Sequence, residues 1–139
     1  MNKIKFAFSL FLFCLVSCNE PEGFKQPEDP LDAGREFIRA VMDGDFKEAE
    51  LYISEDEEDF GLFRRYEDYM KKQPQNERLS LKSASIIINK VENLGDSICL
   101  INFSNSHSMK PMDLKIIREK ENWKVDFSYT FSGNLPIQD

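Results

Sequence analysis

The sequence has 139 residues with a formal net charge of −7, and 31% of its residues are charged. A chain of this length accommodates one domain. Its acidic balance opposes binding to nucleic acid or to an anionic lipid surface, since such binding depends on neutralising phosphate groups with Lys and Arg.

The N-terminal segment has the layout of an export signal. Lys3 and Lys5 precede an apolar run over residues 6–16 that only Ser9 interrupts, which matches the charged and apolar regions of a signal peptide. About 20 apolar residues are needed to span a bilayer as a helix, so this run is too short to do so. We therefore expect an export signal rather than a transmembrane helix.

The end of this apolar run resembles a bacterial lipobox. Leu15 and Val16 are followed by Ser17 and Cys18. The resemblance implies cleavage before Cys18, with lipid attached to its sulfur and to its new amino group. Residues 1–17 are then the signal peptide and Cys18 is the lipidation site. The alternative is an ordinary secretory signal, in which Cys18 is incidental.

Residues 18–29 predict a tether between the lipid and the domain. Glu20, Glu22, Pro21 and Pro27 lie in this segment, and such a composition cannot bury enough apolar area to fold. Each buried methylene of an acyl chain contributes about 0.8 kcal/mol, so two or more chains hold a protein almost permanently. We expect attachment to a membrane of the bacterial cell envelope, with the outer membrane as the expected one and the domain facing the periplasm or the exterior.

The first half of the domain predicts helices. Asp29 can cap a helix that has Pro30 at its first position, and apolar residues then recur at steps of three and four. Gly44 ends this helix. Asp45 begins a second one, with Glu48 three residues later in a box-like arrangement.

A third helix is predicted from a repeat of the same signal. Ser54 and Glu57 have the spacing of a helix start, and the apolar positions after them continue as far as the cations at residues 71–72. Gln73 and Pro74 are expected to end the helical half.

The second half predicts four antiparallel strands, because the apolar period changes to two. An antiparallel sheet with one polar face must bury the other, and the helices are the candidates to cover it. The sequence therefore predicts an α+β fold, with N-terminal helices packed on a curved antiparallel sheet of about four strands. The expected strands are residues 81–91, the segment with Cys99, Ile101 and Phe103, the segment with Met112, Leu114 and Ile116, and the segment with Trp123, Val125 and Phe127.

Trp123 is expected to be a core residue of the last strand. It alternates with Val125 and Phe127, so one face of the strand carries all three large groups. Truncating a buried Trp typically costs about 3–5 kcal/mol of stability. The alternative is an exposed Trp123 at the hairpin end that serves as a binding residue.

The order of short helices and then a curved meander is that of the nuclear transport factor 2-like superfamily, also called ketosteroid isomerase-like or cystatin-like. Residues 37–49 (FIRAVMDGDFKEA) and 119–125 (EKENWKV) resemble the first two helices and the late hairpin of a domain family of unknown function in it, found largely in small bacterial lipoproteins. The resemblance covers about residues 30–131 and implies a cone-shaped domain over residues 30–139. Glycine is usual in that hairpin turn, where this chain has Glu121 and Asn122.

No motif predicts a catalytic residue, a cofactor or a metal. His107, the only histidine, lies in a polar loop, where we expect it to be solvated. Besides Cys18, the mature chain has Cys99 alone, so no internal disulfide is expected, and its place in a strand predicts a buried, unreactive thiol. The acidic residues 55–59 are interpreted as a solvated helix N-terminus rather than a calcium site, because the EF-hand spacing is missing.

Two classes of function remain open at this point. The first is a noncatalytic module that binds a small apolar ligand or a protein partner, consistent with binding pockets being lined mainly by apolar side chains. The second is a small isomerase, dehydratase or hydrolase on the same cone, with an unidentified acid and base. Two titratable side chains that converge in the cone would favour the enzyme. In the absence of a recognisable pair, the sequence favours the binding module.

Overall fold

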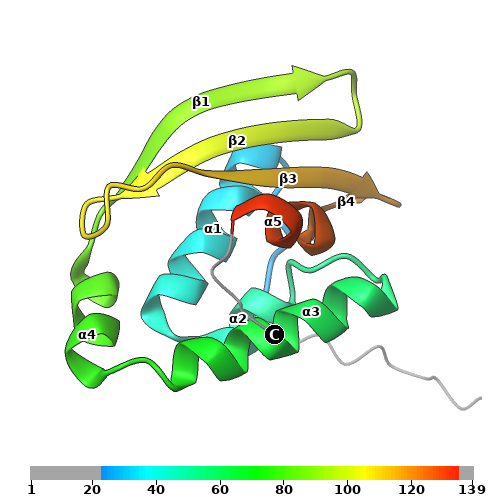
Figure 1. Ribbon diagram of the computed structural model, residues 1–139. Coiled ribbons are helices and arrows are strands. Elements are labelled where there is room, and N and C mark those ends of the chain that lie inside the picture. The colour runs from blue at the N-terminus through cyan, green and yellow to red at the C-terminus, as the bar shows by residue number, and fades with distance from the viewer. Residues whose placement is uncertain (1–22, 135–139) are drawn as a thin grey trace, which may run out of the picture.

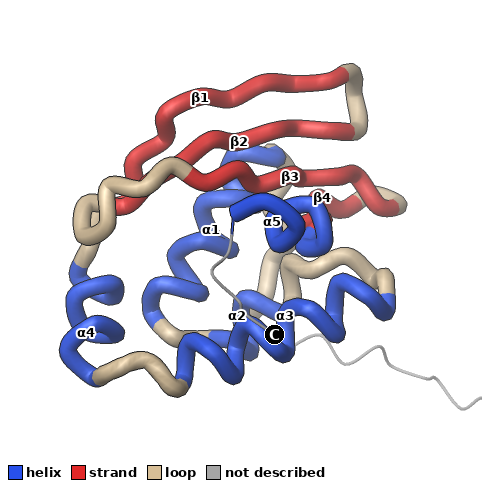
Figure 2. The backbone as a smooth tube through the Cα atoms, viewed as in Figure 1, coloured by secondary structure: helices blue, strands red, loops and turns tan. Residues whose placement is uncertain are grey.

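The computed structural model describes residues 23–134, with side chains as far as Thr130. In this part of the chain, five helices lie on one side of a four-stranded antiparallel sheet (Figures 1 and 2). The predicted α+β class, the number of strands and their antiparallel pairing are therefore confirmed. The strands pair in chain order, from β1 (Ile86–Leu94) and β2 (Ile98–Asn105) to β3 (Met112–Glu119) and β4 (Asn122–Asp126).

The first two helices begin and end where the sequence indicates. Helix α1 (Pro30–Asp43) is capped by the Asp29 carboxylate, and Gly44 ends it with a left-handed φ of 77°. Asp45 caps α2 (Phe46–Glu50) by accepting a hydrogen bond of 3.0 Å from the backbone N–H of Glu48. Local capping chemistry thus sets both helix starts.

Helix α3 (Glu57–Lys71) starts from a different cap than the sequence predicts. Asp56, not Ser54, is the N-cap, and its carboxylate accepts a hydrogen bond of 2.8 Å from the N–H of Glu58. Asp and Ser are about equally good caps, so the local pattern did not decide between them. Ser54 is buried instead and donates its hydroxyl hydrogen bond to Asp59.

A fourth helix, α4 (Gln75–Ser83), replaces the predicted end of the helical half at Gln73 and Pro74. The predicted strand over residues 81–91 is accordingly shorter, and β1 begins at Ile86. The sequence of α4 has no apolar stripe of the kind that predicts a helix, and none of its residues is buried. Arg39 of α1 holds the end of α4 by donating hydrogen bonds of 3.0 Å to the carbonyls of Lys82 and Ala84.

The inner face of the sheet forms the core together with α1. The predicted alternation in β2 and β3 is confirmed, because Cys99, Ile101, Leu114 and Ile116 are all fully buried. Gly34 allows α1 to approach this face closely: a Cβ atom there would lie 2.5 Å from Cδ1 of Ile101. The helix therefore packs directly against the middle of the sheet.

The edge of the sheet at β4 is covered by the segment that precedes α3. Val125 donates a backbone hydrogen bond of 2.7 Å to Tyr52, and Ser54 donates one of 3.0 Å to Val125. Covering an edge strand removes a row of unpaired backbone groups that could otherwise pair with another chain.

The last predicted strand ends earlier than its alternation suggests. Phe127 is buried as predicted, but it is the first residue of α5 (Phe127–Asn134) rather than part of β4. The Asp59 carboxylate accepts hydrogen bonds from the backbone N–H groups of Phe127 and Ser128, at 3.0 and 2.7 Å, and so caps α5 from a distant part of the chain. Asp126, directly before α5, also accepts a hydrogen bond of 3.0 Å from the N–H of Tyr129, so a local cap and a tertiary contact together start a helix where the apolar alternation continues a strand.

Trp123 is half-buried rather than fully buried. It packs against the edge of the core, its ring lies 5.7 Å from the Arg118 guanidinium, and its Nε1–H donates a hydrogen bond of 3.1 Å to the carbonyl of Glu28. Phe24 also packs on the domain, with its ring 5.3 Å from that of Tyr52. The chain is therefore docked on the domain from Phe24 onward, within the segment that the sequence predicts as a tether.

Candidate functional site

A cavity of about 600 Å³ lies between the helices and the inner face of the sheet. This volume is within the range of pockets that hold small molecules. Its wall includes side chains of α1, α3, α4, the sheet, the β2–β3 loop and α5. It is the principal candidate for a binding site in the described part of the chain.

Two helices contribute apolar stripes that face one another across the cavity. Phe37, Ile38, Val41 and Met42 come from α1, where the same periodicity builds the core. Tyr66, Tyr69 and Met70 of α3 contribute side chains at helical spacing, and Gln73 follows just after the end of this helix. The cavity therefore lies beside the C-terminal half of α3.

The other walls come from the sheet and from α5. Phe103, Met112 and Leu114 belong to β2 and β3, and Phe127 and Thr130 belong to α5. Phe127 occupies its place because the Asp59 carboxylate starts α5 there. The buried carboxylate thus positions one wall of the cavity.

Tyr66 is one of the polar side chains in this mainly apolar wall, together with Tyr69, Asn105 and Thr130. Its side chain is 8% exposed, its ring packs 5.7 Å from that of Phe127, and burial raises the pKa of its hydroxyl. The hydroxyl makes no hydrogen bond to any residue that the structure describes. The side chain lines the cavity, so the hydroxyl can form a hydrogen bond with an oxygen of a bound molecule or with a water.

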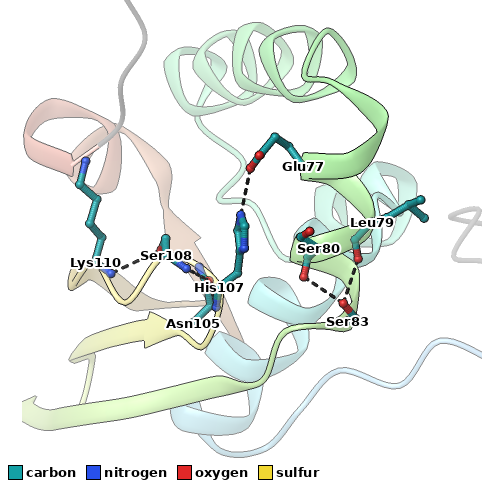
Figure 3. A network of polar contacts seen from close by, with 8 residues as sticks. All are labelled: Glu77, Leu79, Ser80, Ser83, Asn105, His107, Ser108 and Lys110. Atoms are coloured by element: carbon teal, nitrogen blue, oxygen red, sulfur yellow. Dashed lines mark hydrogen bonds and ion pairs between the residues drawn. The ribbon is translucent and has the colours of Figure 1, made fainter.

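A hydrogen-bonded histidine and glutamate lie at the mouth of the cavity. His107 of the β2–β3 loop and Glu77 of α4 are 2.9 Å apart between Nε2 and Oε2, and both line the cavity (Figure 3). Their side chains are 36% and 51% exposed, so water reaches both groups. The sequence predicts a solvated loop histidine, and the structure adds an acidic partner thirty residues away.

The loop that carries His107 is held by the side chain of Asn105, the last residue of β2. The side-chain oxygen of Asn105, a buried residue, accepts hydrogen bonds from the backbone N–H groups of His107 and Ser108, at 3.0 and 2.9 Å (Figure 3). The N–H of Ser106 also donates to the carbonyl of Ser85. The imidazole is therefore held next to α4 by a well-defined backbone.

Two cations also line the cavity. Arg78 follows Glu77 in α4, and Lys110 lies in the same β2–β3 loop as His107. Neither side chain lies within 4.0 Å of a carboxylate of the described residues, whereas Glu77 is already paired with His107. The mouth consequently carries a local excess of positive charge on an acidic protein.

The other residues that the sequence singles out do not join this cavity. Cys99 is fully buried and burial raises the pKa of its thiol, as expected for an unreactive cysteine. Residues 55–58 are exposed at the start of α3, but Asp59 is buried, which corrects the interpretation of the whole run as solvated. Within residues 23–134 there is no group of three or more His, Cys, Asp or Glu side chains that could hold a metal ion.

The predicted lipidation site lies outside the described residues. Cys18 and the signal peptide of residues 1–17 both precede residue 23, and nothing structural bears on them. Among the helices that the structure describes, none has the length and hydrophobicity to cross a bilayer.

The sequence contains part of the signal for this cavity. The apolar stripes of α1 and α3 are visible as helical periodicity, yet a stripe that lines a cavity looks the same as one that fills a core. Tyr66 and His107 gain significance only from their surroundings. No family model matches the sequence, and neither a curated protein nor a solved structure shows significant similarity to it, so the function is argued from the cavity itself.

Proposed function

We propose that this protein is a bacterial lipoprotein, anchored to a membrane of the cell envelope through Cys18, whose nuclear transport factor 2-like domain binds a small apolar molecule. The order of helices and strands, with the helices on one side of the sheet, supports this type of domain. The lipobox-like sequence before Cys18 supports the anchor.

The observation that carries the binding function is the apolar cavity with the unpartnered hydroxyl of Tyr66 in its wall. Small-molecule sites combine mainly apolar walls with a few polar groups that fix the orientation of the ligand. The ligand is accordingly apolar over most of its length and carries an oxygen that hydrogen-bonds to Tyr66.

Dodecanol is expected to bind in this cavity and to perturb the methionines in its wall. Three of the five methionines, Met42, Met70 and Met112, line the cavity, whereas Met109 is exposed and does not. Isotope-labelled methionine methyl groups in the full-length protein, held in phosphatidylcholine nanodiscs, should therefore show saturable shifts at the first three. Tyr66→Phe should weaken binding about fivefold, through the loss of one hydrogen bond.

Tyr52→Phe is the matched control, because Tyr52 is also buried but does not line the cavity. It should leave the affinity for dodecanol unchanged. If saturating dodecanol and its charged dodecyl analogues all leave the three cavity methyl groups unperturbed, the binding function is refuted.

The anchor is tested separately through Cys18. The protein is expected to incorporate labelled palmitate and to partition into detergent, and Cys18→Ser should abolish both, because the thiol is the attachment point of the acyl chains. Cys99→Ser, which changes a buried thiol in the domain, should retain the label. Palmitate incorporated into Cys18→Ser would contradict the proposed anchor.

A second candidate function, a small enzyme on the same cone, is favoured by one observation. The His107–Glu77 pair places an imidazole and a carboxylate together at the cavity, and a carboxylate that orients a histidine is a common arrangement for a general base. Their exposure favours the binding module, since acid–base groups act most strongly where water is excluded. Chemical conversion of a bound ligand that is lost in His107→Gln, with binding retained, would favour the enzyme.

A further inference from the structure

The mouth of the cavity has a charge pattern that the proposed binding function leaves unexplained. Four charged or chargeable side chains line it, Glu77, Arg78, His107 and Lys110. Glu77 and His107 are bonded to one another at 2.9 Å. Arg78 and Lys110 are left without a carboxylate partner among the described residues.

These two cations are distinguished by their place in the wall of an apolar cavity. Among the described residues, some exposed lysines and arginines of the domain form ion pairs with acids, as Lys90 does with Glu92 at 2.8 Å and Arg64 does with Glu50 at 3.1 Å, whereas others, such as Lys47 and Lys82, do not. Acidic residues exceed basic ones by seven in the whole chain. Two cations without an acidic partner beside an apolar cavity therefore form a place where an anion is favoured.

The cavity also has polar groups at two separate places along its length. Tyr66 lies at the start of the lining stretch of α3, and Gln73, seven residues later, lies near the transition to α4 and its Arg78. The rise of the helix separates Tyr66 from Lys71, the last residue of α3, by about 7.5 Å, and Gln73 lies beyond that end. Between them, Tyr69 and Met70 of α3 and the stripe of α1 line the cavity.

We propose that the ligand is an elongated apolar carboxylate whose carboxylate group is held by Arg78 and Lys110 at the mouth and whose remote end carries an oxygen bonded to Tyr66. This inference rests on the proposed binding function and names the chemical class of its ligand. An arginine guanidinium suits the geometry of a carboxylate, and the apolar walls between the two ends accept the methylene chain.

The proposal predicts a ranking among ligands of equal chain length. Dodecanoate should bind the full-length protein in phosphatidylcholine nanodiscs about tenfold more tightly than dodecanol, and dodecyltrimethylammonium should bind most weakly. The shifts of the Met42, Met70 and Met112 methyl groups report on binding, and empty nanodiscs correct for partition into lipid. The preference for dodecanoate should decrease as salt is added, because the cations are solvent-exposed.

Charge-removing variants locate the carboxylate. The double variant Arg78→Gln and Lys110→Gln should remove the preference for dodecanoate over dodecanol, so that the two ligands bind this variant with equal affinity. Lys82→Gln is the matched control: it removes one cation from the same helix as Arg78, at a position that does not line this cavity. It should preserve the preference for dodecanoate.

The remote oxygen is tested with ω-hydroxydodecanoate. It should bind about fivefold more tightly than dodecanoate, and Tyr66→Phe should remove this advantage, as expected for one hydrogen bond. Equal affinities of dodecanoate and ω-hydroxydodecanoate would overturn the assignment of the remote end.

The outcomes separate this inference from the function on which it rests. Equal binding of dodecanoate, dodecanol and dodecyltrimethylammonium, or tightest binding of the cation, would overturn the carboxylate class and leave the binding function intact. If none of the dodecyl compounds shifts the cavity methyl groups, the binding function itself is wrong.

Discussion

Asp59→Ala is expected to lower the free energy of unfolding by about 3–5 kcal/mol, because it removes one acceptor from several buried donors at once. The Asp59 side chain is 3% exposed and accepts hydrogen bonds from the Ser54 hydroxyl and from the backbone N–H groups of Phe127 and Ser128. A domain of this size is held by roughly 5–15 kcal/mol, so the loss is a large fraction of the total. Denaturant melts followed by circular dichroism measure it.

Glu58→Ala is the matched control for this variant. Glu58 is the neighbouring acid in the same run, but it is exposed, so its removal should change the unfolding free energy by less than about 0.5 kcal/mol. Asp59→Asn keeps the shape of the side chain and one acceptor oxygen, and it should fall between the two. Equal midpoints for Asp59→Ala and Glu58→Ala would show that the carboxylate does not hold α5.

Phe63→Ala is expected to cost about 3–5 kcal/mol, the usual range for truncating a fully buried aromatic residue. Phe63 has no exposed surface, and its ring lies 6.1, 6.2 and 5.4 Å from the rings of Phe37, Phe46 and Phe127. Phe63 therefore connects α3 with three other helices, α1, α2 and α5. Trp123→Ala is expected to cost about 1–2 kcal/mol, because this side chain is half-buried and contributes one hydrogen bond.

Asp68→Ala serves as the control on the same helix, since Asp68 is exposed and its variant should keep the parent midpoint within about 0.5 kcal/mol. The order of destabilisation, Phe63 above Trp123 above Asp68, is measured in parallel denaturant melts. A Trp123→Ala variant as unstable as Phe63→Ala would show that the end of the sheet is part of the central core after all.

The cavity residues show why the site was only partly predictable. Tyr66 is one of four tyrosines, and nothing in the sequence distinguishes it from the others. Its hydroxyl becomes notable because α3, α1 and α5 enclose it without offering a partner among the described residues. The His107–Glu77 pair likewise joins a loop to a helix that has no apolar pattern. The contact between these two residues could therefore not be predicted from the sequence.

What the sequence by itself determined is the local order of the chain. The caps Asp29 and Asp45, the stop at Gly44 and the alternation in β2 and β3 all act through contacts between residues close in sequence or through burial of one face. These features give the same answer in almost any tertiary setting, and the predicted α+β fold follows from them.

The tertiary structure alone decided that residues 75–83 form a helix and which apolar stripe lines a cavity, and it reinforced the start of α5. Asp59 caps α5 across a separation of sixty-eight residues, and Arg39 holds the end of α4 across more than forty. Such bonds override the local preference because a buried backbone N–H must find an acceptor wherever one lies. The cavity, the placement of the Tyr66 hydroxyl in its wall and the cations at its mouth all depend on contacts between residues far apart in the chain.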